Sequence, residues 1–171
     1  MVDIDCLEGL KLLYYPDSLD RRTLLLVSSA GEGDPNVMPF SSWSISHVDP
    51  YGWCLAVYVF TRHHTYALVK QTGQFTVNVP RDGMDDIMKQ CGSVSGRDHD
   101  KFAESGLTAV ASRHVVPPVI DECSASFECE VYNKYPFLMT FPGEDKESIE
   151  MMVFEGQILA THAGEDTNSF L

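Results

Sequence analysis

The chain has 171 residues and a mass of 19.1 kDa, enough for one compact domain that buries its core without disulfides or metal ions. With 44% hydrophobic and 22% charged residues it has the composition of an ordinary globular protein, which excludes extensive disorder. Its formal net charge of −13 argues against nucleic acids and membrane surfaces as partners, because affinity for phosphate groups comes mainly from Lys and Arg. We expect a single domain over residues 1–171.

The sequence also indicates a cellular location and a redox state. No apolar run reaches the length of about 18 residues that a membrane span needs, and the first residues, MVDIDCLEGL, carry acids where a signal peptide has basic residues. The five cysteines are an odd number without CxxC spacing, which argues against a disulfide framework and a zinc site. We therefore expect a soluble cytoplasmic protein with reduced, mostly buried thiols.

Positive charge is concentrated in the middle of the chain. Residues 62–113 hold seven Lys and Arg against six acids, a balance of +1, whereas the other residues hold five against nineteen, a balance of −14. The middle segment is therefore the part of the chain where a small anion can be bound most easily.

The first part of the chain predicts a series of strands. Residues 7–15 (LEGLKLLYY) indicate a first strand, and the continuous apolar run at 23–30 indicates a second. The turn sequence GEGDP at 31–35 predicts a hairpin that leads into a further strand beginning at Val37. Residues 53–60 (WCLAVYVF) are the most apolar strand candidate and are expected to be buried.

The middle of the chain predicts two short helices. Thr65 is the expected N-cap of a helix over residues 66–72, and a strand follows at 75–79. Apolar residues at i, i+3, i+4 and i+7 predict an amphipathic helix over 83–91, which Gly92 should end.

The last part of the chain returns to strands. After one predicted helical turn at 101–104, two prolines keep residues 115–119 extended. Residues 125–132 alternate between apolar and polar and predict a half-buried strand, and 151–160 predict a final strand with a bulge at Gly156. At least seven strands with two or three short helices indicate a mostly β protein built as an antiparallel barrel.

Several short motifs occur in an order that resembles the flavin reductase-like family. The first group comprises Asn36, Pro39, the run SSWSIS at 41–46 and the strand that ends in TRHHT at 61–65. Later members, in the same order, are GQFTVNVP (73–80), SGRDHDKF (95–102), Gly106-Leu107 and Phe127-Glu128-Cys129. The resemblance covers about residues 20 to 160 and rests on the order of the pieces, since each is weak alone. It implies an FMN-binding antiparallel split β-barrel, FMN bound non-covalently, and a homodimer.

The residue types at these positions suit FMN. A phosphate dianion needs cationic and hydroxyl donors, which Arg62, His64 and Thr65 supply at the start of a helix, where unpaired backbone N–H groups also favour an anion. Read without the resemblance, the same residues are a solvated strand end. The run SSWSIS offers hydroxyl and backbone groups for the ribityl chain and the ring edge, with Trp43 as a stacking wall, or else it is a polar edge strand. The candidates in this run are Ser41, Ser42, Trp43, Ser44, Ile45 and Ser46.

Two further groups are candidates for cofactor binding. Asn78 and Val79 end an apolar strand, where a buried Asn needs a hydrogen-bond partner that is either the flavin or the barrel. Ser93, Ser95, Arg97 and Lys101 suit a second approach to the phosphate or to a pyridine nucleotide, and a solvated loop is the alternative. No HExxH or other metal-ligand spacing is present, so we expect no metal, and no GxSxG, P-loop or GxGxxG supports a hydrolase, an NTPase or a Rossmann domain.

One departure from the family bears on the electron donor. Members that oxidise NAD(P)H often carry a Gly-Asp-His segment before the last strand, where this chain has Gly143-Glu144-Asp145-Lys146 and, later, Glu150. The resemblance therefore implies an FMN-dependent oxidoreductase of the flavin reductase type that takes electrons from NAD(P)H or from a redox partner protein. The alternative is a non-enzymatic, flavoredoxin-like electron carrier or flavin-binding protein. The sequence identifies no catalytic residue.

Overall fold

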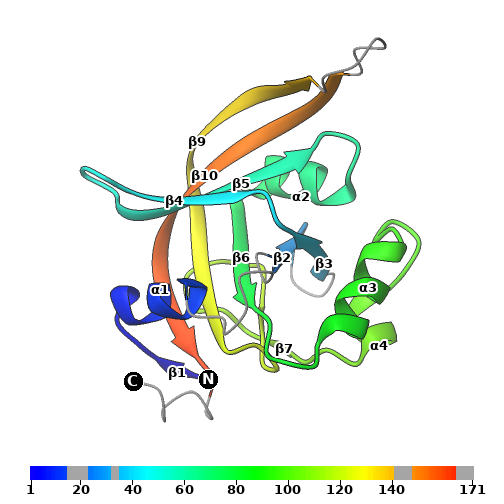
Figure 1. Ribbon diagram of the computed structural model, residues 1–171, viewed down its shortest axis with the longest axis horizontal. Coiled ribbons are helices and arrows are strands. Elements are labelled where there is room, and N and C mark those ends of the chain that lie inside the picture. Colours follow the sequence, from blue (N-terminus) through cyan, green and yellow to red (C-terminus); the bar gives the residue numbers. More distant parts are fainter. Residues whose placement is uncertain (15–22, 32–34, 141–147, 165–171) are drawn as a thin grey trace.

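A computed structural model describes residues 1–14, 23–31, 35–140 and 148–164. In these residues one antiparallel sheet of eight strands has the order β3-β2-β6-β9-β10-β5-β4, with β1 added to β10 (Figure 1). The sheet wraps around one core, because buried residues of β2, β3, β5, β6, β9 and β10 pack into a single cluster. The described parts of β3 and β4, the two ends of the sheet order, do not pair with each other. The expected mostly β, antiparallel split barrel is confirmed.

The described elements have the following bounds. The strands are β1 (Val2–Asp3), β2 (Leu24–Ser29), β3 (Pro35–Phe40), β4 (Trp43–Val48), β5 (Gly52–Phe60), β6 (Gln74–Val79), β7 (Ala109–Val110), β8 (Val119–Ile120), β9 (Ala125–Thr140) and β10 (Ser148–Ala163). The helices are α1 (Cys6–Tyr14), α2 (His64–Thr72), α3 (Asp85–Ser93) and α4 (Lys101–Ser105).

The two longest strands form an arm. β9 and β10 have 16 residues each, and beyond Glu130 the only described partner of β9 is β10 (Figure 1). The register shifts between Glu155 and Gly156, which confirms the predicted bulge. A Cβ atom on Gly156 would lie 2.6 Å from the ring of Phe75, so this position excludes any larger residue.

Residues 7–15 are not the predicted strand, because residues 6–14 form helix α1. Leu10 and Leu13 lie one helical turn apart and are buried against the barrel core, whereas Leu7 is exposed. Leu, Glu and Lys favour a helix, and the contacts of α1 with β9 and β10 stabilise it. The run has too few β-branched residues for its apolar content to indicate a strand.

The ends of the other predicted helices also need correction. Helix α2 begins at His64, its N-cap is His63, and no side chain caps it, so Thr65 is not the N-cap. Gly73 ends α2 with a left-handed φ of 69°, as expected. Helix α3 continues through Gly92 to Ser93, so Gly92 does not end it as predicted.

The polar run after Val37 forms two strands and not one. β3 ends at Phe40 and β4 begins at Trp43, and the exposed Ser41 and Ser42 separate them. β2 and β3 pair antiparallel, with Ser29 opposite Pro35, so the predicted hairpin is confirmed by its strands. The polar turn expected at 143–148 lies mostly outside the described residues.

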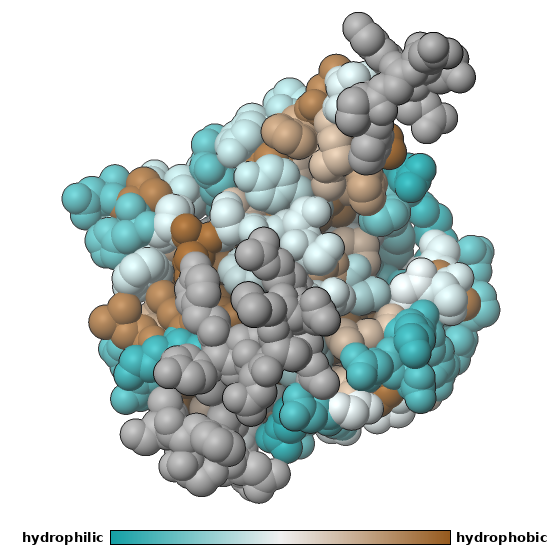
Figure 2. Space-filling model, in the orientation of Figure 1, coloured by the Kyte–Doolittle hydropathy of each residue, from teal (hydrophilic) through white to brown (hydrophobic). Residues whose placement is uncertain are grey.

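Helices α2, α3 and α4 lie on one side of the barrel (Figure 1). Helix α1 lies on the other side, where it contacts β9 and β10. α3 and α4 contact β3, and α2 contacts β2. A second core cluster, which includes Met84, Cys91 and Phe102, joins α3 and α4 to β2 and β3. Space-filling colours mark hydrophilic residues over α3 and α4 and hydrophobic ones along the β9–β10 arm (Figure 2).

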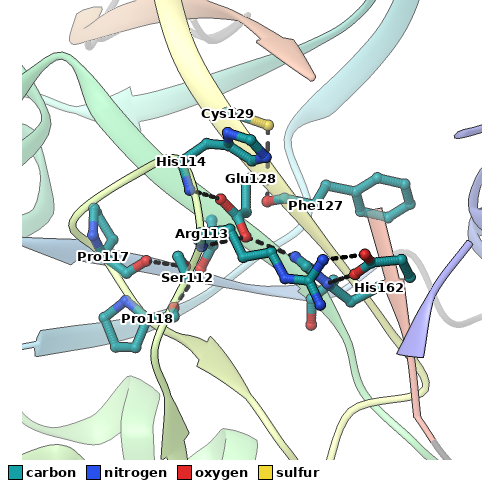
Figure 3. A network of polar contacts seen from close by, with 12 residues as sticks. Ser112, Arg113, His114, Pro117, Pro118, Phe127, Glu128, Cys129 and His162 are labelled. Atoms are coloured by element: carbon teal, nitrogen blue, oxygen red, sulfur yellow. Dashed lines mark hydrogen bonds and ion pairs between the residues drawn. The ribbon is translucent and has the colours of Figure 1, made fainter. Parts of the chain in front are cut away.

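A buried ionic network fixes the loop before β8 and the N-terminal strand (Figure 3). The Glu128 carboxylate is fully buried and accepts hydrogen bonds from the backbone N–H groups of Arg113 (2.9 Å) and His114 (2.7 Å) and from His162 Nε2 (2.6 Å). His162 Nδ1 lies 3.1 Å from Asp3 Oδ1, and the other Asp3 oxygen pairs with the Arg113 guanidinium. Burial alone would raise the pKa of Glu128, but these hydrogen bonds outweigh it and hold the pKa below its ordinary value.

Candidate functional site: a basic pocket between the barrel and two helices

A pocket of about 380 Å³ lies between β3, the start of α2 and the segment that joins α3 to α4. Its size is within the range of small-molecule sites. Five of its lining side chains carry basic nitrogen atoms, in a protein whose net charge is −13. The lining residues are Asn36, Met38, Pro39, Arg62, His63, His64, Thr65, Cys91, Gly92, Ser93, Val94, Ser95, Gly96, Arg97 and Lys101.

The surroundings of the two pocket histidines lower their pKa values and so favour the neutral form. Burial lowers the pKa of His63, and the charges of Arg62, Lys101 and Arg97 lower it further. Burial and the charges of Arg97 and Lys101 also lower the pKa of His64. An anion in the pocket would offset these positive charges, so the electrostatics of the site favour one.

Lys101 is the most deeply buried cation of the pocket. Its side chain is 6% exposed, and Nζ donates hydrogen bonds to the carbonyl oxygens of Val37 (3.1 Å) and Cys91 (2.6 Å). Burial lowers the pKa of Lys101. An ammonium group has three protons, so one remains for a ligand after these two hydrogen bonds. The residue thus joins β3 to the C-terminal part of α3 and places a positive charge beside the pocket.

Two buried polar atoms of the pocket have no hydrogen-bond partner among the described residues. They are Asn36 Oδ1 and His63 Nδ1. Asn36 is 5% exposed, and its Nδ2 donates to Thr65 Oγ1 at 2.9 Å, so the amide is fixed in position with its oxygen unpaired. Both atoms are shielded from solvent, and Asn36 Oδ1 lies against Gly96. A buried polar atom without a partner is unfavourable, so the wall of the pocket carries an energetic cost at these two positions.

The structure brings six of the predicted site residues together in this pocket, although they come from two separate parts of the sequence. Their contact with a flavin stays a prediction. The six residues are Arg62, His64, Thr65, Ser93, Ser95 and Lys101.

The predicted residues of the SSWSIS run do not line the pocket. Ser41 and Ser42 are exposed at the break between β3 and β4, directly after the pocket residue Pro39 and Phe40. In β4, Trp43 and Ile45 face the main core, while Ser44 and Ser46 are exposed on the other face. The run is therefore an edge strand whose first residues lie next to the pocket in sequence.

Asn78 is fully buried, and the barrel uses all of its hydrogen-bonding groups that the structure describes. Nδ2 donates to the Leu25 carbonyl (3.3 Å) and to Thr76 Oγ1 (3.1 Å). Oδ1 accepts from Ile120 N (3.0 Å) and Ser126 Oγ (2.7 Å). Of the two readings that the sequence left open, this geometry favours the structural one. Val79 O accepts from the backbone and the hydroxyl of Ser124, and Val79 does not line the pocket.

Sequence reasoning did not assign several residues that line the pocket. Asn36 belongs to the first motif group, so the sequence marked it without giving it a site role. Arg97, which the sequence groups with Ser93, Ser95 and Lys101 for a phosphate or a pyridine nucleotide, also lines the pocket beside the six residues above. The sequence does not distinguish His63 from His64 as the pocket residue, because the two histidines are adjacent. Gly96 lines the pocket only because β3 lies against it, which is a tertiary contact.

The described residues give two further findings. None of the described helices is long and apolar enough to cross a membrane. Within the same residues, no three or more His, Cys, Asp or Glu side chains are grouped as a metal ion would need. The five cysteines are unpaired, and four of them are buried.

Comparisons with known proteins agree with the fold. A flavoredoxin from Methanosarcina acetivorans superposes with a TM-score of 0.65 at 29% identity, over 84% of this chain and 68% of that one. The flavoredoxin of Desulfovibrio vulgaris (Miyazaki F) gives a TM-score of 0.69 at 23% identity, over 89% and 78% of the two chains. At this lower identity the likeness concerns the fold alone.

Two sequence comparisons each cover most of the chain. An uncharacterized protein of Archaeoglobus fulgidus is 32% identical over 148 residues, which are 84% of this chain and 73% of that protein. The family profile described as flavin reductase like domain matches residues 21–170, which is most of the chain. The protein therefore belongs to the flavin reductase-like domain family.

Proposed function

We propose that the protein binds FMN with its phosphate in the basic pocket and acts as an FMN-dependent oxidoreductase. The observation that carries the proposal is that residues from β3, the start of α2 and the α3–α4 segment converge on one pocket with five basic side chains. Such a pocket in a protein of net charge −13 is a selective site for an anion. Membership of a flavin reductase-like family supports a flavin nucleotide as that anion.

The donors and acceptors of the pocket suit the phosphate end of FMN. Lys101 and Arg62 supply charged donors, and the first backbone N–H groups of α2 point away from the helix and add to the positive potential. The hydroxyl groups of Ser93 and Ser95 line the same pocket and can pair with the ribityl hydroxyls, which a bare phosphate does not offer. The residues present therefore fit a polyol phosphate.

The ring end of FMN would lie toward the break between β3 and β4. Pro39 lines the pocket, and the hydroxyl and backbone groups of Ser41 and Ser42 follow within three residues. We propose these groups for the ring edge, with the remaining SSWSIS residues as weaker candidates. Bound FMN would supply the redox chemistry, and the protein would supply position and electrostatics.

The first prediction tests the cofactor. The purified protein should absorb in the flavin bands and release FMN on denaturation. After removal of flavin it should bind FMN more tightly than riboflavin, which lacks the phosphate, by a factor of about ten or more, the value of one charge-assisted hydrogen bond. Titrations followed by fluorescence measure both affinities. Equal affinity for the two ligands would place the phosphate outside the basic pocket.

A second candidate function is that of an electron carrier that does not oxidise NAD(P)H. The departure at residues 143–146 favours it, although these residues lie outside the described part of the chain. The overall negative charge favours it as well, because acids repel a pyridine nucleotide and attract a basic redox partner protein.

The second prediction separates the two functions. FMN-loaded protein is mixed with NADH or NADPH in an anaerobic stopped-flow instrument. Bleaching of the flavin absorbance within seconds supports the NAD(P)H-dependent enzyme and excludes the pure carrier. Absence of bleaching by either nucleotide, together with prompt reduction by dithionite, excludes the NAD(P)H-dependent enzyme.

The third prediction concerns a homodimer. The apolar strand β5 does not require a partner chain, because β4 and β10 cover its edges and its residues are largely buried within the chain. A better reason to expect a homodimer is the β9–β10 arm, on which Tyr135, Phe137 and Leu138 are 39%, 39% and 63% exposed. Sedimentation at micromolar concentration should give about twice 19.1 kDa. A monomer that retains FMN would contradict this proposal.

A further inference from the structure

One wall of the pocket is a short segment that closes against the barrel. Residues 94–97, named here the closing segment, follow α3 and line the pocket opposite β3. At Gly96 the backbone lies directly against Asn36, since an added Cβ atom would be 2.0 Å from Asn36 Oδ1. Asn36 is in turn bonded to Thr65 of α2. Contact at Gly96 therefore connects the closing segment to both β3 and α2, and only a residue without a side chain permits it.

A second contact joins the closing segment to the chain just before α2. The guanidinium of Arg97 donates hydrogen bonds to the carbonyl oxygen of Arg62 at 3.3 and 3.4 Å. These hydrogen bonds are long and exposed to solvent, so they contribute little and can break and re-form readily. The contact between Arg97 and Arg62 can therefore open, unlike the buried contacts of the core.

The flanks of the closing segment, in contrast, are firmly held. On one side Cys91 of α3 is buried in the second core cluster. On the other side the buried Lys101 is bonded to Val37 O and Cys91 O, and Asp100 caps α4 by accepting from Ala103 N. Fixed flanks with weak contacts between them confine any opening to residues 94–97.

We propose that the closing segment is a gate for the flavin pocket, held shut by Gly96 against Asn36 and by Arg97 against the Arg62 carbonyl. The proposal rests on the proposed function for its ligand. Opening of the closing segment then limits how fast a flavin nucleotide enters and leaves the pocket. The flavin is then a retained cofactor and not a substrate that exchanges in each turnover.

Two variants open the gate in different ways. Gly96→Ala introduces a side chain where Asn36 leaves no room and changes no charge. Arg97→Gln removes the hydrogen bonds to Arg62 together with one charge. Gly31→Ala is the matched control, because an added Cβ atom there meets nothing within 4 Å. Rates of FMN association and dissociation are measured by stopped-flow fluorescence at about 0.5 M salt, which screens the charge effect of the Gln variant.

Both gate variants should raise the association and dissociation rate constants of FMN about three- to tenfold, with a smaller change in Kd, and the control should match the wild type. A rise in dissociation alone, with Kd weakened to the same degree, would mean that Arg97 is a phosphate ligand and would overturn the gate. Unchanged rates in both variants would overturn it as well.

A readout without flavin keeps this test separate from the proposed function. Amide hydrogen exchange of a peptide that spans residues 93–100 should be faster in Gly96→Ala and Arg97→Gln than in the wild type and the Gly31→Ala control. Equal exchange in all four proteins contradicts the gate whatever ligand the pocket binds. Faster exchange in a protein that binds no FMN contradicts the proposed function and leaves the closing segment as a gate for another anion.

Discussion

Glu128→Gln should lower the free energy of unfolding by about 3–5 kcal/mol, the usual consequence of removing one partner of a buried ion pair. Glu128 is fully buried and accepts three hydrogen bonds, from two backbone N–H groups and from His162. The amide of Gln can replace one oxygen but places N–H groups where donors already point. His162 Nε2 and Arg113 N share one carboxylate oxygen and His114 N uses the other, so in either orientation of the Gln amide at least one buried donor loses its acceptor.

Chemical denaturation monitored by circular dichroism measures this loss. Glu130→Gln, two residues along the same strand and exposed, is the matched control and should change the free energy of unfolding by less than about 0.5 kcal/mol. A loss of similar size in both variants would mean that the network of Figure 3 contributes no more than a surface charge. FMN affinity of the folded Glu128→Gln protein should stay close to that of the wild type, because neither Glu128 nor His162 lines the pocket.

The same comparison has a predictable pH dependence. The pKa of Glu128 is lower in the folded protein than its ordinary value of 4.5, so folding favours the ionised carboxylate. Its contribution to stability is therefore complete above the ordinary pKa and is lost as the pH falls through the lowered one. The difference in unfolding free energy between wild type and Glu128→Gln should be constant near neutral pH and should shrink below about pH 4.5. A constant difference down to pH 3 would show that the ionised carboxylate of Glu128 is not the source of the stability difference.

Lys101→Met should weaken the binding of FMN about 10- to 100-fold and leave riboflavin binding nearly unchanged. Lys101 is the buried positive charge of the pocket, and a hydrogen bond to a charged group is worth about 1.5–3 kcal/mol. Met has a similar length without the charge, so packing against β3 and α3 is largely kept. The variant also removes the donor from the carbonyls of Val37 and Cys91, which should lower the free energy of unfolding by about 1–3 kcal/mol.

Comparison of the two ligands separates the loss of charge from a distorted pocket. A distorted pocket weakens FMN and riboflavin alike, whereas a lost phosphate contact weakens FMN alone. Lys89→Met is the control, since Lys89 has a 78% exposed side chain and pairs only weakly with Asp86 on the surface. Equal FMN affinity in Lys101→Met and Lys89→Met would remove Lys101 from the phosphate site.

Sequence patterns sufficed where neighbouring residues decide the structure. The continuous apolar run 53–60 and the alternation at 125–132 predicted β5 and the first half of β9, because a buried or half-buried strand imposes that pattern on its own residues. Gly73 and Gly106 ended α2 and α4 with left-handed φ angles of 69° and 71°, as glycine after a helix predicts. The basic middle of the chain, residues 62–113, likewise supplies all five basic side chains that line the pocket.

Local patterns failed where distant residues decide. The apolar content of α1 does not by itself distinguish a helix from a strand, and the helix is stabilised by burial of Leu10 and Leu13 against β9 and β10, more than 100 residues away. Two asparagines show the same limit. Asn78 is surrounded by donors and acceptors of β2, β8 and β9 and supports the barrel, whereas Asn36 keeps an unpaired oxygen in the pocket.

The sequence alone thus determined the class of the fold, the family and the basic residue types of the site. Those features depend on composition and on the order of short motifs, which a linear chain displays directly. The tertiary structure alone decided that residues 62–65 and 91–101 share one pocket, that Glu128 binds His162 and that Gly96 must lack a side chain to close against Asn36. The physical reason is that each of these depends on atoms brought together by strand pairing and helix packing, and sequence separation carries no information about such distances.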